Sequence, residues 1–184
     1  MAIKKSERGE SALIVIDVQV NVVKDAFMRD EKVANMATAV AKARAASIPV
    51  IWVRHSAEDL PLGTDGWQIV PELLPLPGEP IIEKKYRSSF VETNLEEVLA
   101  NLKVSHLYIC GAETNNCVRH TSMAALEFGY DMTLIEDAHT TTSFEWDGFV
   151  MDAARTIDEQ NTNFIGYRLP SCSADIKMVS ELWN

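Results

Sequence analysis

Short, unbroken apolar runs recur along the chain, separated by longer stretches with a different pattern. Runs of this kind are typical of strands that are buried on both faces of a sheet. They predict strands at residues 11–16, 50–53, 80–83, 104–110 and 132–135, and a last short strand at residues 163–165. The loop between residues 55 and 78 is rich in proline and glycine, so we expect it to be irregular and to wrap over the sheet.

The stretches between these runs have apolar residues at helical spacing. Asp30 is placed to cap a helix that extends to about Ser47, and Thr93 and Glu96 have the spacing of a capping box at the start of another. A third helix opens near Cys117 and stops at Gly129. Its inward-facing positions are expected to be Val118, Thr121, Ala125 and Leu126, and a fourth helix is marked by Phe149, Ala153 and Ile157.

Strands that alternate with helices, each strand apolar throughout, predict an α/β fold. We expect a three-layer α/β/α arrangement with a mainly parallel sheet of about six strands. No stretch of the sequence has the composition of a linker, so residues 1–184 are expected to form one domain.

Composition and charge narrow the range of partners. The formal net charge of −10 disfavours nucleic acid and anionic membranes, which are themselves polyanions. No apolar run reaches the length of a membrane span, and residues 1–10 lack the apolar stretch of a secretory signal. The three cysteines are odd in number and unpaired in spacing, which is typical of reduced thiols. We therefore expect a cytoplasmic protein that acts on a small molecule.

Cys117 is the candidate nucleophile. An apolar strand stops at Gly111, a polar loop follows, and Cys117 falls in the first turn of the expected helix. Free backbone N–H groups and the helix dipole would favour a thiolate there. The alternative role of a cysteine, as a small buried apolar residue, suits Cys110 better because that residue ends an apolar strand.

Two further residues converge with Cys117 on one edge of the predicted sheet. Asp17 ends the first strand and Lys84 follows the third, and sites in parallel sheets lie at the carboxyl ends of the strands. Taken alone, Asp17 could be a turn residue and Lys84 a solvated surface residue. Together, a carboxylate can accept the thiol proton while an ammonium stabilises the thiolate.

At these residues the chain resembles the isochorismatase-like cysteine hydrolases, a family that includes nicotinamidases and N-carbamoylsarcosine amidases. The resemblance covers roughly residues 12–168. Residues 13–19 are similar to the family's opening strand, with Asp17 and Gln19, and residues 111–118 are similar to its nucleophile loop. Residues 84–90 are similar to the family's lysine segment, and residues 62–67 and 71–73 are similar to its characteristic loop.

The resemblance implies a Rossmann-like fold and a catalytic triad of Asp17, Lys84 and Cys117. Asp17 would accept the Cys117 proton, and the sulfur would attack a carbonyl carbon to give a thioester that water cleaves. A cis peptide bond between Ala112 and Glu113 is implied as well, with the backbone N–H groups of Glu113 and Cys117 forming the oxyanion hole.

The chain departs from the metal-binding nicotinamidases, which carry an Asp-x-His pair after the second strand. Residues 53–59 contain His55 alone, and His106, His120 and His139 lie apart from it in the sequence. We therefore expect no metal and no other cofactor, and nicotinamide is disfavoured as the substrate. Val22 also stands where the family has an aromatic residue. Candidate substrate-binding residues are Gln19, Trp52, Trp67, Tyr86, Arg87 and Phe90, and Arg54 is a further candidate for binding a carboxylate.

Three functions are left open. The leading hypothesis is a metal-independent cysteine hydrolase that cleaves the C–N bond of a small amide or ureido compound. The alternatives are a vinyl ether hydrolase of the isochorismatase type, which uses the aspartate as an acid, and a non-catalytic binding protein on the same fold. Relatives are commonly dimers or tetramers, so we expect a homodimer or homotetramer. The expected contact lies on the outer side of the helix after Cys117, at Arg119, His120, Met123, Ala124 and Glu127.

Overall fold

A computed structural model of the chain describes residues 7–183. Most of the N-terminal segment in which we expect no secretory signal therefore lies outside the described residues. Among the helices of the described part, none is both long enough and apolar enough to cross a membrane.

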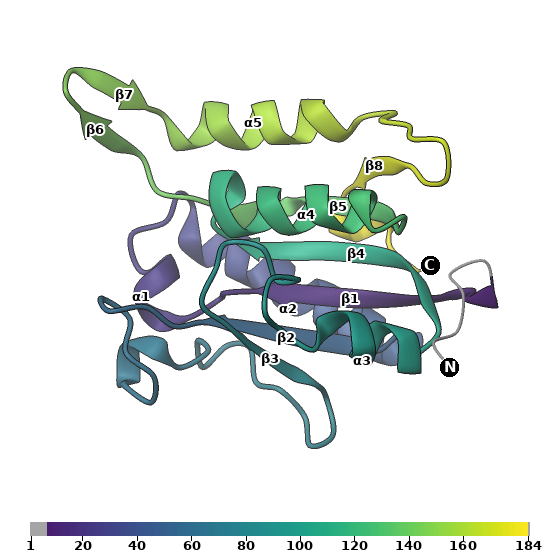
Figure 1. The fold of residues 1–184 in the computed structure, drawn as a ribbon. Coiled ribbons are helices and arrows are strands. Elements are labelled where there is room, and N and C mark those ends of the chain that lie inside the picture. The colour runs from purple at the N-terminus through teal and green to yellow at the C-terminus, as the bar shows by residue number, and fades with distance from the viewer. Residues whose placement is uncertain (1–6, 184) are drawn as a thin grey trace.

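One six-stranded sheet with entirely parallel pairing forms the centre of the fold (Figure 1). The strand order is β3-β2-β1-β4-β5-β8. The strands are β1 (Glu10–Ile16), β2 (Val50–His55), β3 (Ile81–Lys84), β4 (Val104–Ala112), β5 (Asp131–Thr140) and β8 (Ala174–Lys177). The predicted parallel α/β sheet is confirmed, and five of its six strands lie where apolar runs predicted them.

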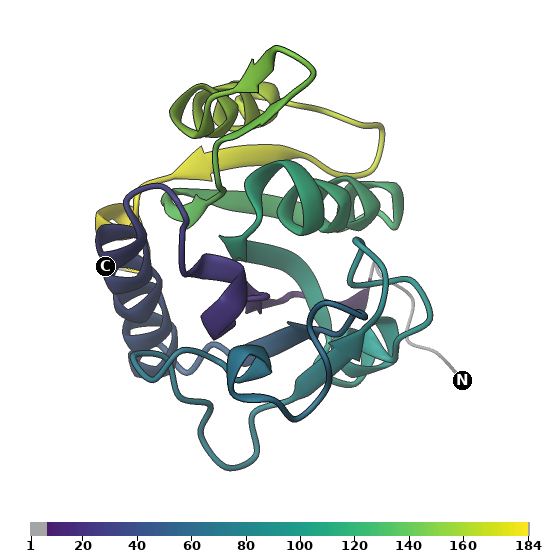
Figure 2. The same ribbon diagram turned by 90° about the vertical axis from the view of Figure 1, so that its left-hand side faces the viewer.

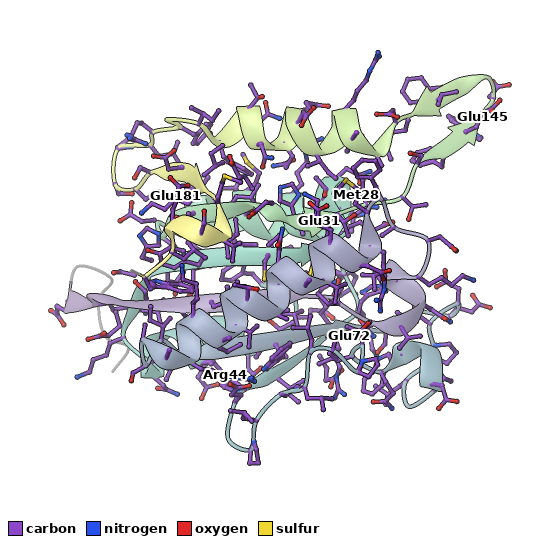
Figure 3. All side chains as sticks on the ribbon, turned by 180° about the vertical axis from the view of Figure 1, so that it is seen from behind. Met28, Glu31, Arg44, Glu72, Glu145 and Glu181 are labelled. Atoms are coloured by element: carbon purple, nitrogen blue, oxygen red, sulfur yellow. The ribbon has the colours of Figure 1, made fainter. Side chains whose placement is uncertain are left out.

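Helices cover both faces of this sheet, which confirms the three-layer arrangement (Figure 2). The helices are α1 (Val20–Val23), α2 (Arg29–Ala45), α3 (Leu95–Asn101), α4 (Arg119–Glu127) and α5 (Ala153–Phe164). Because successive strand residues point to opposite faces, β1 contributes to two cores. Leu13 and Val15 pack with α2, which crosses the back of the sheet between the labelled Met28 and Arg44 in Figure 3. Ile14 and Ile16 pack with α3 and α4.

The C-terminal part of the chain departs from the sequence prediction. Residues 163–165 are not a strand, because Phe164 is the last residue of α5 and packs in the core, and the last strand is β8 instead. Phe149 does not belong to a helix either. It lies in a hairpin of β6 (Phe144–Trp146) and β7 (Phe149–Met151) that projects from the body of the protein, with Glu145 on its outer part (Figures 1 and 3).

A two-residue turn explains the hairpin. Asp147 and Gly148 both have positive φ, at 49° and 75°, the combination that a tight antiparallel turn requires. The side chains of Phe144, Trp146 and Phe149 in this hairpin are at least half exposed, so these apolar residues do not belong to the core of the described chain. This exposure is why apolar spacing alone misassigned the segment.

Two predicted helix caps are also wrong. Helix α2 begins at Arg29, so Asp30 lies in its first turn rather than at its cap. Glu96 makes no capping box with Thr93, because its carboxylate accepts hydrogen bonds from Tyr130 at 2.6 Å and from Arg8 at 3.4 Å. A buried hydroxyl and a guanidinium thus outcompete the helix terminus for this side chain.

The outer side of α4, where we expect a subunit contact, borders a shallow depression of about 500 Å³. Besides the five residues predicted there, it is lined by Ser88, Phe90, Val91 and Phe128. The oligomeric state stays a prediction.

Gly111 permits a close approach between the two central strands β1 and β4. It pairs with Ile16 across β1 and β4 and has a φ of +126°, which side-chain-bearing residues rarely adopt. A Cβ built there would lie 2.1 Å from the backbone oxygen of Ile16. Because the obstacle is backbone, no side-chain rotation can relieve the clash.

We predict that Gly111→Ala lowers the free energy of unfolding by about 3 kcal/mol or more, because it combines backbone strain with a main-chain clash. Urea denaturation followed by circular dichroism measures this change. Gly9→Ala is the matched control, since nothing lies within 4 Å of a Cβ at that position. Equal stability of the two variants would contradict the close-approach argument.

Candidate active site

Asp17 is the first residue after β1 and has a left-handed backbone conformation, with φ at 50°. Aspartate tolerates this region better than most residues. The backbone N–H of Asp17 donates to Val53 of β2 at 3.0 Å, which anchors the bend to the sheet. The bend leaves the carboxylate buried, with 1% of the side chain exposed.

Lys84 ends β3 and points to the same place from two strands away. Its ammonium lies 2.6 Å from the Asp17 carboxylate and 3.2 Å from the Cys117 sulfur. Its third neighbour is His55, with 3.3 Å between Lys84 Nζ and His55 Nδ1. Lys85 is exposed and lines a separate depression. The structure therefore brings together the three residues singled out from the sequence.

Cys117 lies in a π-helical turn, Thr114–Val118, rather than in the first turn of an α-helix. Helix α4 begins only at Arg119. The peptide bond between Ala112 and Glu113 is cis, at the position that the family resemblance implies. Val118, Thr121, Ala125 and Leu126 are buried as predicted, so the helical period that follows the turn was read correctly.

The electrostatics of the site favour a protonated Cys117 in the resting protein. Burial, and secondarily the Asp17 charge, raise the pKa of the Cys117 thiol to about 12 against the opposing effect of Lys84. The expectation of a thiolate stabilised by the helix is therefore wrong for this state. Burial also raises the pKa of Asp17, against the opposing effect of Lys84. The raised pKa makes the ionised carboxylate a better proton acceptor.

Side chains at and just after the end of β5 brace the turn that carries Cys117. His139 Nδ1 lies 2.8 Å from the Thr114 hydroxyl, and its Nε2 lies 2.8 Å from Asn161. Thr141 donates to Asn115 at 2.7 Å. Burial lowers the pKa of His139 to about 4, so it is neutral near pH 7. The sequence did not associate His139 with this turn, because the apolar run at residues 132–135 does not reveal that β5 extends to Thr140.

A cleft of about 620 Å³ is lined in part by Cys117 and lies at the carboxyl ends of the strands. Helix α1 follows β1 at this end of the sheet and faces the viewer in Figure 2. Asp17 and Cys117 form part of its wall, and Arg87 and Val22 line it too. The remaining lining residues are Asn21, Asp25, His55, Asp59, Leu60, Glu113, Asn116 and Thr142.

Sequence reasoning did not assign Asn21, Asp25 or Thr142 to the cleft. Asp59 and Leu60 fall in the loop at residues 55–78, and Asn116 falls in the segment 113–116, two stretches that were expected to carry specificity, although none of the three was singled out. Asn21 and Asp25 carried a signal, because they follow Asp17 at successive helical intervals of four residues. Asp59 and Leu60 belong to an irregular loop, whose course no periodicity reveals.

Of the six candidate substrate-binding residues, only Arg87 lines the cleft. Gln19 is fully buried and structural: its amide binds the backbone oxygens of His55 and Trp67 at 3.0 and 2.7 Å. It thereby ties the loop after β2 to the bend after β1.

The four aromatic candidates lie elsewhere. Trp52 is fully buried and donates to Glu79 at 2.7 Å, while Trp67 donates to Ser56 at 2.9 Å. Tyr86 borders the depression near Lys85, and Phe90 stacks on Phe128 with ring centroids 4.9 Å apart. Core packing and surface stacking explain these residues.

Arg54, the second candidate for binding a carboxylate, is held outside the cleft. Its guanidinium pairs with Glu83 and lies 3.8 Å from the centre of the Trp67 ring.

His55 is the only histidine that lines the cleft within the described chain. Burial, and secondarily the Lys84 charge, lower its pKa. Between residues 7 and 183 no three side chains of His, Cys, Asp or Glu are grouped closely enough to hold a metal ion.

Comparison with known proteins agrees with this geometry. The family model described as the isochorismatase domain matches residues 11–163. An uncharacterized isochorismatase family protein, YddQ of Bacillus subtilis (strain 168), is 32% identical over 152 residues, covering 78% of this chain and 84% of the relative. The ureidoacrylate amidohydrolase RutB of Enterobacter sp. (strain 638) is 29% identical over 170 residues, covering 70% of this chain and 74% of the relative.

Among solved structures, an isochorismatase from Pseudomonas putida KT2440 superimposes with a TM-score of 0.84 and 29% identity. The match covers 99% of this chain and 93% of that one. Agreement in domain model, sequence and backbone over most of its length shows that the chain belongs to the isochorismatase family of hydrolases.

Proposed function

We propose that this protein is a metal-independent cysteine hydrolase that cleaves the C–N bond of a small amide or ureido compound. One observation carries the proposal: the Cys117 sulfur lines an open cleft and lies 3.2 Å from the Lys84 ammonium, which is 2.6 Å from Asp17. A nucleophile, a base and a fixed positive charge are thus within reach of one bound substrate. The name of the Enterobacter relative, a ureidoacrylate amidohydrolase, supports this class of bond.

In the proposed reaction Asp17 takes the thiol proton as the Cys117 sulfur attacks the carbonyl carbon. The C–S bond forms, and the carbonyl π electrons move to oxygen. Backbone N–H groups of Glu113 and Cys117 are the proposed donors to that oxyanion, and such donors are typically worth about 3 kcal/mol each. As the oxyanion collapses, the C–N bond breaks and Asp17 returns the proton to the leaving nitrogen.

Water completes the cycle. Asp17, ionised again, accepts a proton from a water molecule that attacks the thioester carbonyl, and the sulfur leaves and is reprotonated. Lys84 keeps its charge throughout, so it can stabilise the thiolate each time the sulfur is negative. This sequence needs no metal, because the protein supplies both the nucleophile and the charge stabilisation.

A vinyl ether hydrolase is the second candidate, because the pKa of Asp17 is raised by burial. An aspartate of this kind can carry a proton nearer neutral pH and donate it to a vinyl ether carbon. That route makes no use of a nucleophile, so the presence of Cys117 beside Lys84 favours the amidase.

We predict that Cys117→Ala and Asp17→Asn each lower kcat by roughly 10³-fold or more, because both residues serve one covalent step. Turnover is measured on a panel of small amides, ureides and isochorismate. Cys172→Ala is the matched control, since that thiol is buried and bonds to Leu126, away from the cleft. If Cys117→Ala retained near-wild-type turnover of isochorismate, the vinyl ether route would replace the amidase.

We also predict that Asp17→Asn makes Cys117 more reactive toward iodoacetamide at pH 8, although it abolishes turnover. The Asp17 charge raises the pKa of Cys117 and the Lys84 charge lowers it, so removing the carboxylate increases the thiolate fraction. In the wild type, with a pKa of about 12, the alkylation rate should still rise with pH at pH 10. Mass spectrometry of the Cys117 peptide measures both rates, and slower alkylation of Asp17→Asn would contradict this reading of the site.

A further inference from the structure

Negative charge dominates the wall of the cleft. Asp17 is offset by Lys84, which leaves three carboxylates, Asp25, Asp59 and Glu113, facing one guanidinium, that of Arg87. The other lining side chains are polar or apolar and, with His55 neutral, uncharged. A bound molecule therefore meets a negative potential beside the nucleophile.

Asp59 is the carboxylate best placed to contact a substrate. It follows the β2 end of the sheet in the loop that walls the cleft, and it interacts electrostatically with His55. His55 in turn lies 3.3 Å from the Lys84 ammonium. Asp59, His55 and Cys117 line one cleft, so a substrate bound there for attack by the Cys117 sulfur shares that cleft with the Asp59 carboxylate.

Neither of the other carboxylates is equally suited to bind a substrate. Glu113 is held by Asn116, which donates to it at 2.8 Å, so its charge is fixed close to the sulfur. Asp25 lies 3.6 Å from the Lys24 ammonium, which offsets part of its charge.

The positive groups near the cleft do not reverse this balance. Arg87, which is exposed as Asp59 is, can offset one of the three carboxylates at most, while Arg54 is held by Glu83 and Trp67 outside the cleft. The chain as a whole carries a formal net charge of −10, which attracts cations and repels anions at long range.

We propose that the substrate is a small amide that carries a cationic group, and that Asp59 binds that group. The proposal rests on the proposed amide hydrolysis and adds the charge of the part of the substrate that is not cleaved. An ammonium or guanidinium three or four bonds from the carbonyl has the size that a cleft of about 620 Å³ accommodates.

Three amides of equal chain length test the charge. 4-Aminobutanamide ends in an ammonium, pentanamide in a methyl group and glutaramate in a carboxylate. Binding of each to the Cys117→Ala chain is measured by calorimetry, and turnover of each is measured with the wild type. We expect the cationic amide to bind most tightly and glutaramate least tightly, and added salt to weaken only the binding of the cationic amide.

Asp59→Asn tests the residue. In the Cys117→Ala background we expect it to reduce the preference for the cationic amide over pentanamide by about fivefold, the size of a favourable exposed ion pair. Glu58→Gln is the matched control, because it removes the same charge from the neighbouring residue, which does not line the cleft. If Asp59 had only a structural role, Asp59→Asn would weaken the binding of all three amides alike and leave the ratio of their affinities unchanged.

The outcomes separate this inference from the proposed function. Preferred binding of glutaramate, equal or absent binding of the cationic amide, or equal effects of Asp59→Asn and Glu58→Gln would each overturn the assignment of Asp59. A cationic preference in binding without turnover of any amide would instead support the binding assignment and reject amide hydrolysis.

Discussion

The buried ion pair between Asp17 and Lys84 is the interaction on which the rest of the site depends. Its side chains are 1% and 0% exposed, and an uncompensated charge at such depth costs several kcal/mol. Each residue is therefore tolerated only because the other is present. Since β2 separates the strands that carry them, the pair also requires the register of three strands to be correct. The two charges also act in opposite directions on the pKa of Cys117, which burial raises most, so sheet geometry and chemistry are coupled.

The cleft combines a fixed part with a variable part. The fixed part comes from strand ends and from the turn after β4, which is braced by hydrogen bonds with His139 and Thr141. The variable part comes from the irregular loop after β2, which contributes Asp59, and from the turn after α1, which contributes Asp25. A family that keeps the first part can change its substrate by changing the second, because loop residues carry little of the core.

Sequence reasoning succeeded where burial imposes a pattern. Apolar runs located β1 to β5, and the rule that parallel strands present their carboxyl ends at one edge brought Asp17, Lys84 and Cys117 together. It failed where an apolar residue lies in a different environment from the one its position in the sequence suggests. Phe149 is exposed on a hairpin, and Trp52 fills the core instead of the cleft. The electrostatic state of Cys117 was also beyond reach, because the burial that raises its pKa is a property of the folded chain alone.

Because its pKa depends on burial, the Cys117 sulfur differs in reactivity between the unfolded and the folded chain. In an unfolded chain Cys117 is surrounded by water and has an ordinary thiol pKa of about 8.5, so a few per cent of it is thiolate at neutral pH. Oxidants such as peroxide react with thiolates far faster than with thiols. Folding places the sulfur beside Asp17 in a partly buried site and raises its pKa to about 12. Folding therefore lowers the reactivity of Cys117 toward oxidants, and the newly made chain is the form most exposed to damage.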